Sequence, residues 1–301
     1  MLPSVTGTTQ QYLADLERNQ LQLQRAETEI SSGLQVQQPS DDPTAIAEIS
    51  QTQAAIAQNT QIQSNLGEVT TEANRADSVL QTAVQALENA ISLAAEGATS
   101  TATPESQAAL AQQISGLQQT LVGISQTTVN GRYIFSGDQD TQPAYQLDSS
   151  QPNGVQQLLN APATRVIQSV DGTSIAVAKT ASEIFDAPGA NNVFAAINSL
   201  LTALNTNDQT GITNASDALK SASTYLNGQL AFYGSVENRL QEATGLAQKF
   251  QTQQQTQLSQ LQDADIPTVA TQLTQLQVEQ QASMSVESNI AQMKNLFNYL
   301  A

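Results

Sequence analysis

The sequence predicts a mainly α-helical protein, in which both ends of the chain form a long antiparallel coiled-coil rod around a small β-rich insert. Three observations lead to this prediction. Apolar residues recur every seven positions through two long segments, which is the pattern of coiled-coil helices. Gly, Pro and Asp cluster at two short stretches that separate these segments from shorter terminal helices. Turn residues multiply between β-prone runs in the middle of the chain, where we expect a few strands.

The composition argues against several classes of function. The 301 residues contain no Cys, His or Trp and carry a net charge of −17. Without Cys and His there is no disulfide and no Cys/His zinc site, and the commonest general base is missing. With only ten Lys and Arg residues, the chain lacks the basic surface that nucleic acids and anionic membranes require. We find no pair of nucleophile and base and therefore expect no enzyme and no cofactor.

The start of the chain has no features of a cleaved signal peptide. Residues 1–7 contain neither a basic nor an apolar stretch, and both are parts of such a signal. No window approaches the run of about 18 apolar residues that a membrane helix needs. We therefore expect no membrane association. If the protein works outside the cell, we expect it to leave by a route that uses no cleaved signal.

Residues 8–32 are predicted to form the first amphipathic helix. Leu16, Leu23 and Ile30 are seven residues apart, which places them on one seam of a heptad pattern. The second seam position is taken by Tyr12, Asn19 and Ala26. Asn19 is therefore a polar gap in an otherwise apolar stripe.

A joint follows this helix at residues 33–43. Gly33 suits a helix end because the left-handed conformation favoured there is free of steric conflict without a Cβ. Asp42 can cap the next helix, and Pro43 fits its first position, where the missing N–H would be unpaired anyway. Asp41 and Asp42 also favour the positive end of that helix. The two aspartates could instead form a metal or acid–base pair, but no third ligand lies nearby in the sequence.

The segment 43–95 has helical periodicity over its whole length. Such length without caps is typical of a coiled coil rather than of a compact globular protein. A turn at 97–103 precedes a helix that begins at Thr103 and Pro104, and we expect this helix to fold back antiparallel on the previous one. The two heptad series of the long segment are Ile62, Val69, Ala76, Ala83, Ala90 and Leu66, Ala73, Leu80, Leu87, Ala94.

Short β-prone runs mark the middle of the chain. The runs 164–170 and 173–178 flank Asp171 and Gly172, and two such runs around Asp-Gly predict a hairpin. The pair at 130–131, Asn-Gly, could also be a hairpin turn. A helix precedes it, however, so we expect a helix end that leads into a strand.

Polar and aromatic residues in the same region have competing interpretations. Asp138 and Asp140 lie two residues apart in a polar loop and weakly suggest a cation site. The calcium-loop pattern with its later Gly and Glu is absent, so we expect no metal there. Tyr133 and Phe135 are more simply explained as core residues than as a binding platform.

Helical periodicity returns after the insert. We expect a helix at 192–205, a turn at 208–211, and then a long helix with the most regular heptads of the chain. Its two series are Ile212, Leu219, Leu226, Tyr233, Leu240, Ala247 and Ala215, Ala222, Gln229, Val236, Ala243, Phe250. The pattern fades in the glutamine-rich run that follows.

A second joint precedes the last helix. Asp263 and Asp265 flank a helix start, where they can complement its positive end, and Pro267 fits its first turn. A pair of terminal helices buries too little to be stable alone, so we expect their other faces to pack on other copies of the chain. The candidate assembly residues are Leu16, Leu23, Ile30, Val269, Leu273, Leu276, Ile290, Phe297 and Leu300.

These features divide the chain into predicted segments that are arranged symmetrically about the insert. The segments are 1–42, the N-terminal assembly helix and joint; 43–136, the N-terminal part of the rod; 137–190, the β-rich insert; 191–262, the C-terminal part of the rod; and 263–301, the C-terminal assembly helix.

Several motifs resemble those of the bacterial flagellin family. Ile30-Ser31-Ser32-Gly33, followed by Ser40-Asp41-Asp42-Pro43, is similar to the family's N-terminal signature. Residues 130–137 resemble the stretch that enters the middle domain of family members that join the hook to the filament, and residues 295–300 resemble the ending of those members. The resemblance spans residues 8–135 and 190–301.

This resemblance implies a structural component of the bacterial flagellum, located outside the cell and exported in an unfolded state through the flagellar type III apparatus. It implies a ring of copies at the hook–filament junction, with a hook-associated protein on the hook side, flagellin on the filament side and an export chaperone as partners. A short filament flagellin is the alternative within the family. Outside the family, the alternatives are a soluble coiled-coil signalling protein or a type III translocator, although a translocator usually needs an apolar membrane-inserting stretch.

Overall fold

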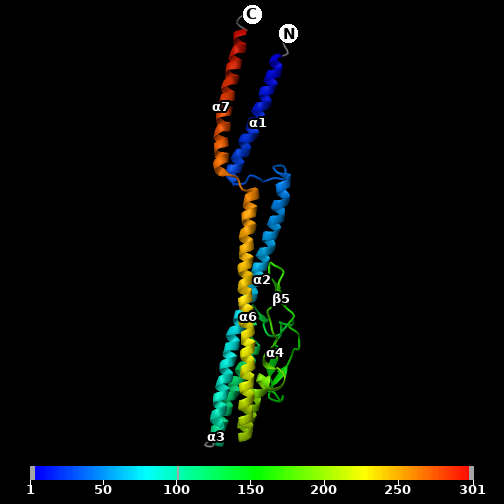
Figure 1. Cartoon of the computed structure of the whole chain (residues 1–301), viewed down its shortest axis with the longest axis vertical. Helices are drawn as coiled ribbons and strands as arrows, with labels where there is room; N and C mark the ends of the chain where they lie inside the picture. The colour runs from blue at the N-terminus through cyan, green and yellow to red at the C-terminus, as the bar shows by residue number, and fades with distance from the viewer. Residues whose placement is uncertain (1–3, 100–101, 298–301) are drawn as a thin grey trace. The chain divides into compact units, whose positions relative to one another are not determined.

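The computed structural model describes residues 4–99 and 102–297 (Figure 1). About 71% of the chain is helical, and small antiparallel strand pairs lie in its middle, so the predicted mainly α fold is confirmed. Contacts group the chain into two compact units, which are described separately below. The terminal unit contains residues 1–58 and 251–301, and the central unit contains residues 59–250. The finer division of the sequence into five segments stays a prediction.

The terminal unit is built around two helices from opposite ends of the sequence. Helix α1 (Ser4–Ser32) and helix α7 (Ile266–Phe297) lie side by side and run in opposite directions (Figure 1). The unit also contains the first turns of α2 (Pro43–Gly97) and the last turns of α6 (Gln209–Gln262). Both ends of the sequence thus contribute to one helix pair.

The heptad seams predicted on α2 and α6 are buried in the central unit. Every member from Leu66 to Ala94 on α2 and from Ile212 to Ala247 on α6 is buried, whereas Phe250 is 40% exposed. The Asn59 side-chain amide of α2 donates a 2.9 Å hydrogen bond to the carbonyl of Ala247 on α6. The two helices run antiparallel (Figure 1).

Shorter helices complete the helical part of the central unit. Helix α3 (Pro104–Ser125) begins at the predicted residues, with Thr103 as its N-cap and Pro104 in its first turn. Thr103 and Ser106 form a capping box. Helix α3 packs along α5 (Val193–Asn205). A single-turn α4 (Ala181–Phe185) and a 3-10 turn (Gly189–Asn191) precede α5. The turn before α6 ends earlier than the predicted 208–211, because α6 already begins at Gln209.

Within residues 4–99 and 102–297, the strands form three separate two-stranded antiparallel hairpins. The hairpin around Asp171 and Gly172 is confirmed. At Asn130 and Gly131 the expected helix end is wrong, because these residues form a hairpin turn between two short strands. Their φ angles of +50° and +78° are those of a type I′ turn, which Asn-Gly favours. The pairs are β1 (Thr128–Val129) with β2 (Arg132–Tyr133), β3 (Tyr145–Leu147) with β4 (Val155–Gln157), and β5 (Val166–Gln168) with β6 (Ser174–Ala176).

The hairpins share one core with the helices. Phe135, which follows β2, is fully buried and packs edge-on against Phe185 of α4 and Tyr233 of α6, with ring centroids 6.2 and 6.3 Å apart. An ion pair joins Arg165, just before β5, to Glu72 of α2. The middle of the chain is therefore fastened to both long helices by apolar and charged contacts.

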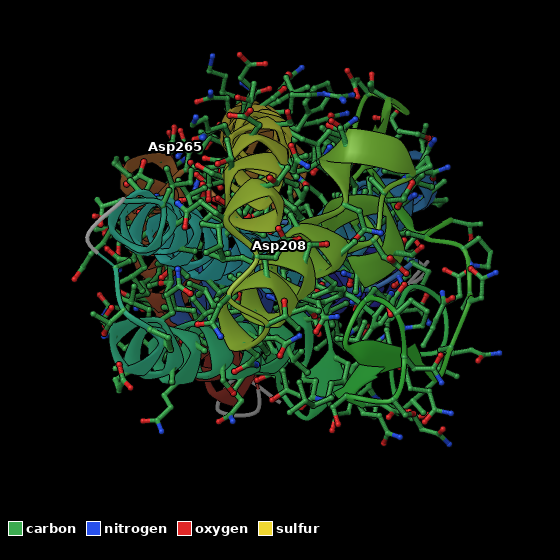
Figure 2. All side chains as sticks on the ribbon, turned by 90° about the horizontal axis from the view of Figure 1, so that it is seen from below. Asp208 and Asp265 are labelled. Atoms are coloured by element: carbon green, nitrogen blue, oxygen red, sulfur yellow. The ribbon has the colours of Figure 1, made fainter. Side chains whose placement is uncertain are left out.

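Two aspartates labelled in Figure 2 precede long helices. The Asp208 carbonyl accepts the N–H of Ile212 at 2.9 Å at the start of α6. The Asp265 carbonyl accepts the N–H of Val269 at 2.9 Å at the start of α7. Within the described part of the chain, no helix combines the length and apolar character needed to cross a membrane.

Candidate functional site

The candidate site is the pair formed by α1 and α7, together with the two joints at their bases. On α1, burial follows the predicted heptad: Leu16, Leu23 and Ile30 are half-buried and Ala26 is buried, while most of their neighbours are exposed. On α7, Val269 is buried, and the half-buried seam positions are Leu273, Leu276, Gln280 and Ser283. Two of the other candidate assembly residues, Ile290 and Phe297, lie in α7 with undescribed side chains, and Leu300 lies outside the described residues. The structure thus brings six of the nine candidates onto the seam of one helix pair.

Polar contacts occur alongside apolar ones farther from the joints. The Tyr12 hydroxyl donates a hydrogen bond of 2.5 Å to the carbonyl of Ser283, and the Asn19 amide donates one of 3.3 Å to the Glu279 carboxylate. Among the described residues, the Asn19 Oδ1 atom is buried and accepts no hydrogen bond. A polar residue at a seam position lowers stability but favours one partner and one register. The seam is therefore apolar near the joints, and farther out the polar contacts of Asn19 and Tyr12 lie on either side of the apolar Leu16.

The first joint has the local structure that its residues favour. Gly33 ends α1 with a φ of +74°, and its N–H still donates to the Glu29 carbonyl at 2.8 Å. The Asp42 carboxylate caps α2 by accepting the N–H groups of Thr44 and Ala45 at 2.9 and 3.0 Å. Pro43 is the first residue of α2. Gly33 thus ends the first helix, and Asp42 with Pro43 begins the second.

Asp41 stabilises the joint itself rather than the helix that follows. Its Oδ2 atom accepts the backbone N–H groups of Gln37 and Gln38 at 3.0 and 2.9 Å. These hydrogen bonds from Gln38 and Gln37, with the nearby Arg25 charge, lower the pKa of Asp41, because they stabilise the ionised carboxylate. The sequence identified Asp41 but assigned it to the positive end of the helix.

The second joint is fixed by short-range contacts of its aspartates. The Ser259 hydroxyl donates to the Asp263 carboxylate, and the Thr268 hydroxyl donates to the Asp265 carboxylate at 2.8 Å. Pro267 is the second residue of α7, where its missing N–H leaves no intrahelical bond unmade. Asp263 therefore acts at the end of α6, and Asp265 acts at the start of α7.

The two joints are hydrogen-bonded to each other, which sequence reasoning missed. The Gln35 N–H donates to the Gln262 carbonyl at 2.8 Å, and the Ala264 N–H donates to the Gly33 carbonyl at 2.9 Å. Leu34 and Asp263 form an antiparallel bridge between these contacts. The carbonyl of Gln262, at the end of α6, has no partner within its own helix. This joint clamp, residues 33–36 with 262–264, therefore uses a group that the helix leaves free.

Apolar side chains also lie on the outer faces of the two terminal helices. They fall outside the heptad positions, so the sequence analysis did not select them. They could have been found in the sequence as apolar residues that lie off the predicted seam of an amphipathic helix. Exposed apolar side chains mark a contact with another molecule where they gather into a contiguous patch. The exposed fractions are 49% for Leu13, 66% for Leu21, 61% for Val278, 51% for Met284 and 47% for Val286.

The polar residues weighed as metal ligands have protein partners. Asp138 accepts the N–H and hydroxyl of Thr164 at 3.1 and 2.8 Å, and Asp140 pairs with Arg132. Within the described ranges, the structure contains no group of three or more acidic side chains placed to hold a metal ion. Tyr133 is half-buried. Asp138 and Asp140 thus hold the local structure around β2 and β5.

The two ends of the chain pair as helices in one unit, and the middle of the chain folds into a second unit with its own core. Residues 4–140 match the bacterial flagellin N-terminal helical region, and residues 216–300 match the bacterial flagellin C-terminal helical region. The chain therefore belongs to the bacterial flagellin family, a family of flagellar structural proteins.

Three relatives show where in this family the similarity lies. The chain is 27% identical to flagellar hook-associated protein 3 of Escherichia coli over 212 residues, which cover 65% of this chain but only 64% of that protein. A flagellar hook-associated protein from Vibrio parahaemolyticus has a similar structure, with a TM-score of 0.66, 19% identity and coverage of 74% of this chain and 100% of that one. The flagellar junction protein of Legionella pneumophila aligns with a TM-score of 0.57 and 12% identity, covering 65% and 99% of the two chains. The structural likenesses support the fold.

Proposed function

We propose that this protein forms the junction between the flagellar hook and the filament. The observation that carries the proposal is the sequence similarity to hook-associated protein 3, which extends over most of this chain. The exposed apolar side chains on the outer surfaces of α1 and α7 support it, because they are available for packing against other molecules. In this role copies of the chain form a ring, with a hook-associated protein on one side and flagellin on the other.

The proposed mechanism is mechanical. The seam residues Leu16, Leu23 and Val269 hold α1 against α7 within one chain, while outer residues such as Leu21 and Val278 contact neighbouring copies. The joint clamp keeps the bases of α1 and α7 together. The joints then allow the helix pair to adjust between a bending hook and a stiffer filament.

We also propose export without a cleaved signal, through the flagellar type III apparatus and in an unfolded state. A chaperone bound to the C-terminal helix keeps α7 from pairing before export. The absence of cysteine suits this route, because the unfolded chain cannot be trapped by a disulfide.

The test is electron microscopy of a strain that lacks the gene, combined with an immunoblot for flagellin in the culture medium. Bare hooks with flagellin lost into the medium are expected for the junction role. Bare hooks without released flagellin would identify this chain as the filament subunit, and normal filaments would overturn the proposal. Restoring the gene on a plasmid must restore the filaments.

A further inference from the structure

Asn-Gly occurs at three places in this chain, 130–131, 153–154 and 227–228. In this dipeptide the backbone nitrogen of Gly can attack the side-chain amide of Asn, because Gly has no side chain to hinder the approach. The reaction needs freedom of both the Asn side chain and the Gly N–H. The sequence gives all three pairs the same chemistry, so the structure decides which of them can react.

Two of the three pairs are held by hydrogen bonds. The Asn227 side-chain amide, inside α6, donates to the Ser223 carbonyl at 2.9 Å. The Asn153 side-chain amide donates to Asp186 at 3.4 Å, and the N–H of buried Gly154 donates to the Gln151 carbonyl at 3.0 Å. A reactive geometry at either place requires these bonds to break and the surrounding backbone to open.

The first pair is placed differently. Asn130 and Gly131 are both exposed, at the tip of the hairpin between β1 and β2. Among the hydrogen bonds of the described residues, none involves the Asn130 side chain or the Gly131 N–H. The flanking strands are two residues long, so opening the turn breaks few contacts. Short exposed turns lie at the low end of the range of local opening free energies.

We propose that Asn130 is a site of spontaneous deamidation in the folded protein. The Gly131 nitrogen forms a bond to Cγ of Asn130, the bond from Cγ to Nδ2 breaks, and ammonia leaves with the proton that Gly131 gives up. The five-membered imide that results is opened by water at one of its two carbonyls. The products are aspartate and isoaspartate, and each adds one negative charge to the turn.

Isoaspartate also lengthens the backbone by one atom, which matters at this position. The hairpin register pairs Thr128 with Tyr133, and the next residue, Ile134, donates its N–H to the Thr127 carbonyl at 3.1 Å. The residue after that is Phe135, which is fully buried in the aromatic cluster. A longer turn shifts this register and loosens the entry of Phe135 into the core.

The test is peptide mapping by mass spectrometry after incubation of the purified full chain at mildly alkaline pH. We expect Asn130 to deamidate at least about tenfold faster than Asn153 and Asn227, since tenfold corresponds to only about 1.4 kcal/mol of opening free energy. Incubation in 18O-labelled water identifies the products of imide hydrolysis, and separation of the peptides distinguishes aspartate from isoaspartate.

The same chain in concentrated denaturant is the matched control. There the three sites are expected to react at similar rates, because the folded structure no longer protects two of them. Equal rates in the folded protein, or faster reaction at Asn153 or Asn227, would overturn the proposal. The same order of rates in the folded and denatured chains would also overturn it, because neighbouring residues rather than the fold would then set the rates.

Discussion

The N–H of Gln35 donates a 2.8 Å hydrogen bond to the carbonyl oxygen of Gln262. These residues belong to different joints and are separated by most of the sequence. Gly33 ends α1 with a φ of +74°, and its carbonyl accepts the Ala264 N–H in the same joint clamp. The backbone conformation of Gly33 is therefore part of the clamp that holds the bases of α1 and α7 together.

Gly33→Ala is expected to destabilise the joint clamp. A Cβ at Gly33 meets no atom within 4 Å, so the effect comes from the left-handed backbone alone, at about 1–2 kcal/mol. Amide hydrogen exchange at Gln35 and Ala264 should become faster. The matched control is Gly67→Ala, since Gly67 lies in α2 with equally open space, and there alanine should stabilise the helix by about 0.5–1 kcal/mol. Similar effects at both positions would contradict the backbone argument.

The first joint is expected to loosen in acid. The pKa of Asp41 is lowered from its ordinary value of 3.8, so its carboxylate stabilises the joint above that pH and this contribution is lost as the pH falls through the lowered pKa. After correction for intrinsic rates, amide exchange at Gln37 and Gln38 should accelerate in that range. Asp41→Asn should show fast exchange at every pH, and an unchanged pH profile in this variant would assign the effect to another group.

Leu23→Asp and Leu21→Asp separate pairing within the chain from packing between chains. Leu23 is half-buried on the seam, so a carboxylate there should destabilise the α1–α7 pair by about 1–2 kcal/mol. Leu21 is 66% exposed, and its replacement should change monomer stability by less than about 0.5 kcal/mol. Hydrogen exchange at the amides of α7 measures the stability of the α1–α7 pair. Incorporation into flagella measures packing between chains and should fall for both variants. Normal incorporation of Leu21→Asp would exclude the outer surface around Leu21 from assembly.

Glu72→Gln is expected to destabilise the central unit. The Glu72 and Arg165 side chains are 15% and 36% exposed, so removing one charge leaves the other partly desolvated, at about 1–3 kcal/mol. Urea unfolding measures the change. Asp217→Asn is the control, because its ion pair with Lys220 is on the surface and should contribute about 0–1 kcal/mol. Equal effects would mean that burial of the first pair is unimportant.

Helices and their buried faces could be predicted because each depends on a pattern within the sequence. The spacing of Leu66, Leu80 and Leu87 alone predicts which face of α2 is apolar, and no other segment has to be considered. The hairpin turn at Asn130 was considered, but a helix end was preferred to it. Helix α3 already ends at Ser125, which leaves enough residues for the short strand β1 before the turn.

The contacts of the joints could not be predicted in the same way. Those between Gln35 and Gln262 and between Gly33 and Ala264 use backbone groups, which every residue carries, so no side-chain pattern reports them. The role of Asp41 was missed for a related reason, since its partners are the N–H groups of an irregular turn. Backbone hydrogen bonds between distant segments can be identified only in the folded structure.

The shared core of the central unit has a consequence for how the protein is made. Its buried residues run from Leu66 on α2 to Ala247 on α6. The apolar seam of α2 and that of α6 each need the other parts of this core to be buried. Most of the chain must therefore be synthesised before the last seam residues leave the ribosome. Until then, the alanine-rich face of α2 and the aromatic residues of the insert have no complete partner surface. Folding of this unit must wait for nearly the whole chain, and the nascent protein stays open for most of its synthesis.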